Sequence, residues 1–287
     1  SPSPVLTWTK CAASVRNTNL SRIASRRCIA PSSRNTNRAH PGMRLIGHPH
    51  HPSDKPMPKK ITLFLAVFVL MVAYSLRIYD LQTMPPGMHF DEAQYIYRAW
   101  RFGEGFGLSI QFNDSPEPFD PMLRGIFMRF TGYTDFSARI QTIWLNVLAV
   151  AATMAAARAL FRGHPHRRWI ILFAGLTFAV IPASVLLGRY IYRMHHIPLY
   201  SMLAVAALAW GWRTRKTRYF AIAGLCSGLA AIFYLAGLVF PFIMGGLIVL
   251  TVLIDRRMWP GVKNLVVFGI ATLIALSPWL WMYINVP

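Results

Sequence analysis

The acidic residues of this chain are concentrated in one polar segment, and their types and spacing could do chemistry. Eight of the ten aspartates and glutamates lie between Asp80 and Asp135, and Asp91 and Glu92 are adjacent. A positioned carboxylate can take a proton from a weak nucleophile such as a hydroxyl, and carboxylate oxygens can also hold a divalent metal ion. The sequence therefore directs the search for a functional site to this segment.

Histidines leave metal binding open as an alternative. His89 lies two residues before Asp91, and His195 and His196 form a pair further along the chain. Imidazole nitrogens ligate divalent metals, although histidines at a membrane interface are more often plain surface residues. The cysteines add no metal-ligand spacing, because two lie near the N-terminus and Cys226 lies in an apolar run. A divalent metal is therefore the only cofactor that the sequence leaves open.

The elements that must position these residues are mostly apolar. Hydrophobic residues make up 54% of the chain, charged residues only 14%, and the mean hydropathy is +0.38, which is too apolar for an ordinary soluble domain. A helix needs about 20 apolar residues to cross a bilayer. We expect an all-α fold, a polytopic transmembrane bundle of about seven spans with a long loop that carries interfacial helices after the first. The expected spans are Ile61–Leu76, Phe136–Leu160, Trp169–Leu187, Ile197–Trp212, Tyr219–Leu235, Leu238–Ile254 and Leu265–Tyr283.

Charged residues in the short turns predict an orientation. Lys and Arg gather in the turns after the second, fourth and sixth spans, and in Lys59-Lys60 before the first. Short basic loops stay on the cytoplasmic side of a membrane. We therefore expect the acidic segment on the external side of a bacterial inner or plasma membrane. The basic residues of the three turns are Arg162, Arg167, Arg168, Arg213, Arg215, Lys216, Arg218, Arg256, Arg257 and Lys263.

The acidic segment contains the pattern of a helix that lies on a membrane surface. Apolar and aromatic residues recur at roughly helical spacing between Asp91 and Phe102. Asp91 and Glu92 then lie at the N-terminus of this helix, where the helix dipole favours negative charge. Asp91 could simply cap the helix, and this alternative stays open beside the catalytic one.

Residues 1–56 differ from the rest of the chain in composition. They are rich in Ser, Arg, Asn and Pro, without an acidic residue before Asp54. This is typical of a disordered basic tail, a transit peptide or translation upstream of the true start. We expect a natural start at Met57, or otherwise Met43, and the first span could instead be a cleaved signal peptide. Residues 57–287 then form the transmembrane catalytic domain, which we expect to be a fragment because no soluble domain follows the seventh span.

One motif and several later stretches resemble a known family. Pro85-Pro86-Gly87-Met88-His89-Phe90-Asp91-Glu92-Ala93 resembles the signature of GT-C superfamily glycosyltransferases, the group of the protein O-mannosyltransferases and the bacterial aminoarabinose transferase. The later stretches resemble the family's first external loop, its entry into the second span, its second external loop and its Gly-rich fifth span. They are Glu117-Pro118 with Phe127 to Gly132, Ser137-Ala138-Arg139-Ile140, Gly188-Arg189-Tyr190 through Pro198, and Gly224 to Leu229 with Tyr234.

The resemblance implies a reaction. A sugar would move from a polyprenyl-phosphate donor to a lipid, glycan or protein acceptor at the external face, with inversion at the anomeric carbon. At the matching positions, Asp91 would be the general base that takes the proton of the acceptor hydroxyl, and Glu92 would orient Asp91 or the acceptor. Glu117 matches a family position and, with His89, is an expected substrate-binding residue, although the neighbouring Asp120 and Glu117 could be solvated turn residues.

The same reaction needs a fixed cation, because negative charge grows on the lipid phosphate as the sugar leaves. Arg139, Arg189 and Arg193 are the candidates at the expected external face, since a guanidinium matches phosphate oxygens in a fork. Each could instead only anchor a span at the headgroups. Many relatives carry a basic residue before the proline that corresponds to Pro241, whereas this chain has none between Tyr234 and Pro241, so one phosphate contact could be missing or supplied from elsewhere.

Other classes of protein are weaker matches. The net charge of +20 does not indicate nucleic-acid binding, because much of it lies in the N-terminal tail and beside membrane spans, where anionic lipids explain it. A secondary transporter would need ionisable residues within its spans, and the spans between Trp169 and Tyr283 hold no carboxylate. A non-catalytic polytopic membrane protein is the remaining alternative.

Overall fold

The computed structural model describes residues 58–83, 87–105 and 118–285, all within one unit, Asp54–Pro287. These residues form helices and no strand, so the all-α prediction is confirmed for them. The N-terminal tail 1–56, the Pro85-Pro86 turn and Glu117 lie outside the described residues. The helices are α1 Lys59–Ile78, α2 Phe90–Gly103, α3 Phe119–Thr131, α4 Asp135–Leu160, α5 Arg167–Val180, α6 Pro182–Leu187, α7 His196–Thr214, α8 Thr217–Ile232, α9 Val239–Ile254 and α10 Val262–Asn285, with 3-10 turns η1 Arg193–His195, η2 Leu235–Leu238 and η3 Arg256–Met258.

Four helices are long and apolar enough to span a membrane, which supports an integral membrane protein. They are Lys59–Ile78, Asp135–Leu160, Leu235–Ile254 and Val262–Met282. Three of the seven expected spans fall short of this standard among the described residues. The expected third span is broken into α5 and α6, α7 begins with a histidine and has an arginine near its end, and α8 has only 16 residues.

The break in the expected third span has a local cause and a partner. Pro182 has no backbone N–H and cannot continue the hydrogen-bond ladder of α5. The fully buried Arg77 of α1 donates to the backbone oxygen of Ala179 at 3.0 Å and to Ser184 Oγ at 2.8 Å. A helix end leaves carbonyls without partners, so Arg77 satisfies the end of α5 and holds the start of α6.

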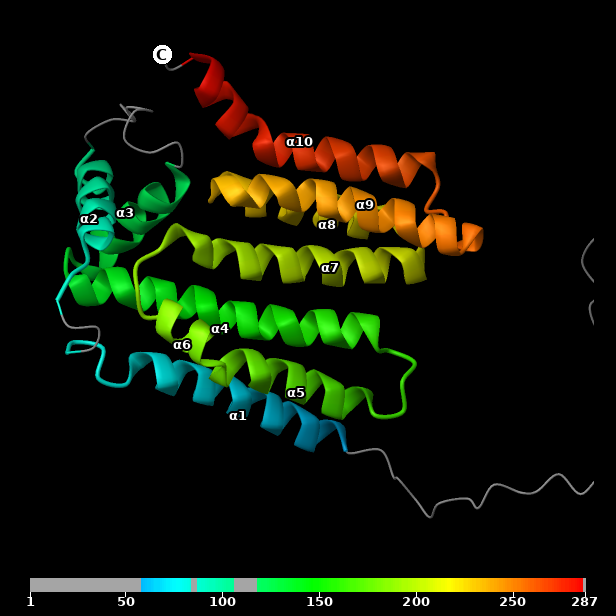
Figure 1. Cartoon of the computed structure of the whole chain (residues 1–287), viewed down its shortest axis with the longest axis horizontal. Helices are drawn as coiled ribbons and strands as arrows, with labels where there is room; N and C mark the ends of the chain where they lie inside the picture. Colours follow the sequence, from blue (N-terminus) through cyan, green and yellow to red (C-terminus); the bar gives the residue numbers. More distant parts are fainter. Residues whose placement is uncertain (1–57, 84–86, 106–117, 286–287) are drawn as a thin grey trace, which may run out of the picture. The chain divides into compact units, whose positions relative to one another are not determined.

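The central helices can be less apolar because they face protein. In α4, 61% of the most apolar window is buried, against 17% in α1. Helix α7 packs against both α4 and α8, and α8 packs against α10 (Figure 1). Gly224 and Gly228 of α8 allow this last contact, since a Cβ on either would meet the backbone of Phe268 or Thr272 on α10.

The basic turns meet at one end of the bundle. Arg213 Nη2 donates to the backbone oxygen of Leu160 at 2.7 Å, and Arg215 donates to the backbone oxygens of Trp259 and, at 2.7 Å, Arg257. These bonds join the turns after α4, α7 and α9. We call this the basic end.

Helices α2 and α3 lie at the opposite end, which we call the acidic end (Figure 1). The two helices pack closely, because a Cβ on Gly125 of α3 would meet the backbone oxygen of Ala99 on α2. The helix expected between Asp91 and Phe102 is therefore present as α2. Its outer face exposes Phe90, Tyr97 and Trp100, as an amphipathic helix requires.

Candidate functional site

The start of α2 is organised by a capping box. His89 is the N-cap, its Nδ1 accepts from the Asp91 backbone N–H at 3.3 Å, and its own backbone N–H donates to Glu92 Oε2 at 3.1 Å. The alternative that Asp91 caps this helix is therefore wrong, because His89 does so. Asp91 Oδ2 lies 3.7 Å from His89 Nδ1, and a nitrogen that accepts from a backbone N–H has no proton for an ion pair.

Glu92 is fully buried and holds three separate segments together. Its Oε1 accepts from the Ile191 backbone N–H at 2.9 Å, and its Oε2 accepts from Arg139 Nη2 at 3.3 Å and from the His89 backbone N–H. Buried carboxylates need such partners to stay charged. Glu92 thus contacts backbone N–H groups and Arg139, and it fixes the start of α2, which carries Asp91.

Arg139 connects the segment that follows α1 to Glu92. It is 5% exposed, and it donates to the backbone oxygens of Leu81 at 3.3 Å and Gly87 at 2.8 Å in addition to Glu92. The guanidinium thus fixes the start of α4 against the segment between α1 and α2. The sequence proposed Arg139 for phosphate binding, and the structure gives it a position inside the protein.

Asp91 differs from its neighbour because its side chain is half exposed. Its charge is felt in the segment between α6 and α7, where burial and then the charges of Asp91 and Glu92 raise the pKa of Tyr192. Tyr95 lies one helical turn after Asp91 and therefore on the same face of α2. Asp91 thus presents a carboxylate next to the Tyr192 segment.

Arg193 reaches this face of α2. Its guanidinium lies 5.5 Å from the ring centre of Tyr95 and 5.5 Å from that of Tyr234. Cation–π contacts of this kind help to hold a guanidinium in place. Arg193 therefore brings a positive charge to Tyr234, at the junction where the sequence lacks a basic residue. Arg189 lies nearby in the chain and donates to the backbone oxygen of Asp80 at 3.1 Å.

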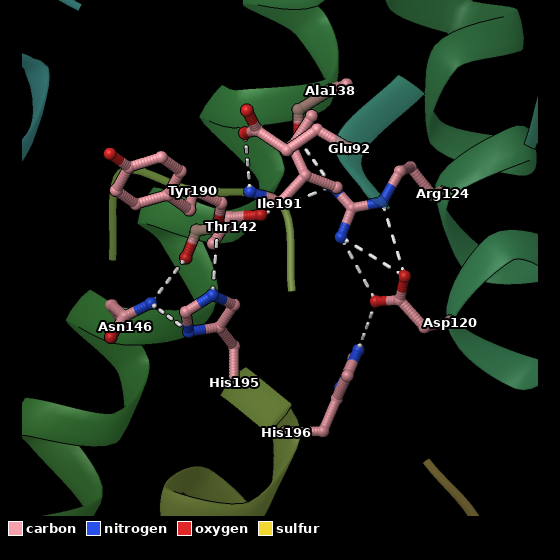
Figure 2. A network of polar contacts seen from close by, with 10 residues as sticks. All are labelled: Glu92, Asp120, Arg124, Ala138, Thr142, Asn146, Tyr190, Ile191, His195 and His196. Carbon is pink, nitrogen blue, oxygen red and sulfur yellow. Dashed lines mark hydrogen bonds and ion pairs between the residues drawn. The ribbon is translucent and has the colours of Figure 1, made fainter. Parts of the chain in front are cut away.

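A second polar cluster is fully buried between α3, α4 and α7 (Figure 2). Arg124 Nη2 contacts Asp120 Oδ1 at 3.1 Å, and its Nη1 donates to the Ala138 backbone oxygen and to Thr142 Oγ1. His196 Nε2 lies 3.1 Å from Asp120 Oδ1. Burial alone would raise the pKa of Asp120, but the charge of Arg124 and the hydrogen bond from His196 hold this pKa below its usual range.

His195 is also buried and is neutral. Its Nε2 donates to the Tyr190 backbone oxygen at 3.1 Å, and its Nδ1 accepts from Asn146 Nδ2 at 3.1 Å. Burial first, and then the charge of Arg124, lower the pKa of His195 to about 3. The expectation that the histidine pair lies on the surface is wrong, as is the alternative that Asp120 is a solvated turn residue.

The structure describes most of the predicted site residues. The structure brings Asp91, Glu92, Arg139 and Arg193 to the acidic end, while His89 caps α2. Within the described ranges, no three His, Cys, Asp or Glu side chains are grouped as metal ligands, so the proposed pairing of the histidines with Asp91 around a metal does not form there.

The sequence analysis did not predict that two arginines are buried. Arg77 and Arg124 are both fully buried and fully surrounded by protein. Asp120 and Arg124 are four residues apart, a spacing that places opposite charges side by side on a helix, so this pair had a readable signal. Arg77 had a weaker one, an arginine within the last turn of an apolar helix.

No protein-family model matches this chain, and no curated protein matches it. The fold and the site define a helical membrane protein that buries a network of charged and polar side chains at one end. Its function has to be inferred from this geometry.

Proposed function

We propose that this chain is part of a membrane glycosyltransferase of the GT-C type. It would transfer a sugar from a polyprenyl-phosphate donor to a hydroxyl of a lipid, glycan or protein acceptor, with the acidic end on the external face of a bacterial inner membrane. The observation that carries the proposal is the different placement of two adjacent carboxylates. Glu92 is buried and fixes the start of α2, whereas Asp91 is half exposed beside Tyr192.

The chemistry assigns Asp91 the role of general base. As the acceptor oxygen attacks the anomeric carbon, its proton passes to the Asp91 carboxylate, and the bond between that carbon and the phosphate oxygen breaks. The polyprenyl phosphate leaves with the electron pair, and the configuration inverts. A positioned base of this kind contributes typically about 10²–10⁴-fold to a rate.

The charge of the leaving phosphate is assigned to Arg193, with Arg189 as a second contact. Arg193 lies 5.5 Å from the ring centres of both Tyr95 and Tyr234, and a guanidinium matches phosphate oxygens in a fork. Arg139 is the weaker candidate because it is 5% exposed and already bonds Glu92, Leu81 and Gly87. This placement also supplies the basic group that the Tyr234 junction lacks.

Asp91→Asn tests the proposal. The change keeps the size of the side chain and removes its basicity, so transfer of sugar from polyprenyl-phosphate donors should fall at least about 10²-fold while the Tm stays within a few degrees. Asp135→Asn, at an exposed carboxylate of the same end, is the matched control and should keep parental activity. The full-length protein in proteoliposomes is the material for the assay. Parental turnover by Asp91→Asn would remove Asp91 as the base.

A secondary transporter is the second candidate function. The buried cluster of Asp120, Arg124 and His196 favours it, because ionisable groups inside a helical bundle often mark an ion pathway. Proteoliposomes separate the two functions. A transporter should carry protons or solute across the vesicle wall, whereas a transferase should move labelled sugar from donor lipid to acceptor without such flux.

A further inference from the structure

Two adjacent histidines differ in how completely their nitrogens are satisfied. His195 uses both ring nitrogens, one towards Tyr190 and one towards Asn146. His196 is equally buried but uses only Nε2, which faces Asp120. Its Nδ1 is buried and has no hydrogen-bond partner among the described residues. Polar atoms in protein interiors are nearly always paired, so this nitrogen calls for an explanation.

The partner of Nε2 decides what Nδ1 can do. Asp120 is ionised and accepts hydrogen bonds only, because Arg124 contacts both of its carboxylate oxygens. Nε2 of His196 therefore carries a proton, and in a neutral ring this is the only proton on nitrogen. Nδ1 then carries a lone pair and can accept a hydrogen bond, but it has none to donate.

The ring of His196 cannot turn easily to find another partner. Phe233 stacks on it with ring centres 3.8 Å apart and planes 12° from parallel, and Tyr200 lies nearly parallel to it as well. Rotation of the ring would also break the bond to Asp120. The acceptor at Nδ1 is therefore fixed in direction as well as in tautomer.

We propose that His196 Nδ1 accepts a hydrogen bond from a hydroxyl of a bound substrate, so that Asp120 and His196 form a hydroxyl-binding site separate from Asp91. His196 is the first residue of α7 and directly follows the segment that carries Tyr192 and Arg193. Helix α2, which carries Asp91, and the start of α7 lie at the same end of the bundle (Figure 1). The nature of the ligand, a sugar of the lipid donor or the acceptor, rests on the proposed function. Because Nδ1 is buried, binding must include a local shift of the side chains around it.

A pair of amide substitutions separates the two nitrogens of the ring. His196→Gln places an amide near the position of Nε2, so it can still donate to Asp120 but has no acceptor at the position of Nδ1. His196→Asn places its amide near the position of Nδ1 and does not reach Asp120. His195→Gln controls for altered packing in the same buried cluster, and His166→Gln, at the basic end, controls for loss of a histidine elsewhere.

Direct binding measurements supply the first readout. The probes are undecaprenyl phosphate and undecaprenyl phosphate carrying mannose, glucose or 4-amino-arabinose, bound to the full chain in nanodiscs. For the sugar lipid that the parent prefers, His196→Gln should weaken binding about five- to tenfold and leave undecaprenyl phosphate unchanged, which is the loss expected for one hydrogen bond. Neither control should change the ratio between the two lipids, even if His195→Gln lowers the Tm.

The remaining outcomes identify the source of the hydroxyl. Unchanged donor binding with a five- to tenfold loss of turnover at saturating donor would assign the hydroxyl to the acceptor. His196→Gln with parental binding and turnover would overturn the inference while Asp91→Asn still tests the transferase. A parent that binds none of the sugar lipids better than undecaprenyl phosphate would instead count against the proposed function.

A second measurement does not depend on any substrate. Solid-state ¹⁵N spectra of histidine-labelled protein in liposomes report whether the Nδ1 lone pair is hydrogen-bonded, and the His196 signal is assigned as the one lost in His196→Gln. We expect a neutral ring with a free Nδ1 in the absence of ligand. An Nδ1 that is already hydrogen-bonded there, to water or to protein, would overturn the inference.

Discussion

At the acidic end of the bundle, Glu92, Asp120 and Arg124 are fully buried, whereas at the basic end Arg213 and Arg215 are exposed. Both sets of charges bind backbone or side-chain partners across the bundle. The buried charges depend on each partner, because removing one leaves an uncompensated charge away from water. The exposed charges are screened by water, so each pair contributes little, and they act mainly through the total positive charge of the turns. The same residue types thus fix local geometry at one end and overall orientation at the other.

The side of the membrane on which each end lies has the largest consequence for this comparison. In a variant without Cys11, Cys28 and Cys226, Thr131→Cys at the acidic end and Lys216→Cys at the basic end each offer one thiol. An impermeant maleimide should label the first in intact cells and the second only after permeabilisation, because basic turns remain cytoplasmic. Labelling in the reverse order would place Asp91 on the cytoplasmic side and end the proposed external reaction.

Breaking the buried pair should have the largest effect on stability. Arg124→Met leaves Asp120 buried with His196 as its only remaining partner among the described residues, so the free energy of unfolding should fall by about 3–5 kcal/mol. It is measured by titration with sodium dodecyl sulfate in mixed micelles. Arg256→Met, at the basic end, should change it by less than about 0.5 kcal/mol.

Adding Asp120→Asn to Arg124→Met removes the stranded charge and keeps an acceptor for His196. The double variant should therefore regain part of the loss. A double variant no more stable than Arg124→Met alone would show that the pair does not act through its charge.

The neutral state of His195 predicts a pH dependence. Its pKa is about 3 in the folded protein against an ordinary value of 6.5, so between these values the unfolded chain binds more protons and stability falls as the pH falls. The slope should approach about 1.4 kcal/mol per pH unit between pH 6 and pH 5.

His195→Gln keeps a donor for the Tyr190 oxygen and removes the titration, so its slope in this window should be smaller by about that amount. His166→Gln, at the basic end, should keep the parental slope. Equal slopes for the parent and His195→Gln would mean that His195 is not held neutral.

The smallest effect is expected at Arg215. This residue has a positive φ of 55°, which glycine adopts more readily, while its side chain bonds the Trp259 and Arg257 oxygens at the surface. Arg215→Gly relieves the backbone and loses the bonds, so its stability should stay within about 1 kcal/mol of the parent. Arg215→Ala loses the bonds without that relief and should be the less stable of the two by about 1 kcal/mol. A loss above about 3 kcal/mol in Arg215→Gly would contradict the view that exposed charges act only weakly.

The sequence predicted the long apolar helices well. The runs 61–76 and 136–160 appear as α1 and α4 with bounds within two residues, because apolar length and absence of charge are properties of the local chain. The helix from Asp91 also follows from local periodicity. The third expected span is interrupted at Pro182. Arg77 of α1 stabilises this break, and it lies 105 residues before Pro182 in the chain, too far for a local pattern to show.

The candidate site was predicted only in part. Asp91 and Glu92 look alike in the sequence, since both are carboxylates at the start of one helix. Their different environments come from Arg139 and Ile191, which the fold brings to Glu92 and not to Asp91. Sequence periodicity could not show this, because the two partners lie on other elements.

By itself, the sequence determined which segments are apolar helices, which turns are basic and where the carboxylates gather, since each of these depends on composition over a few turns of chain. Tertiary structure decided which charges are buried, that His89 caps α2, and that His195 and His196 differ. The physical reason is that the state of a polar group inside a protein depends on its partners. Those partners come from other helices, here α1, α4 and α7, as well as from the group's own helix.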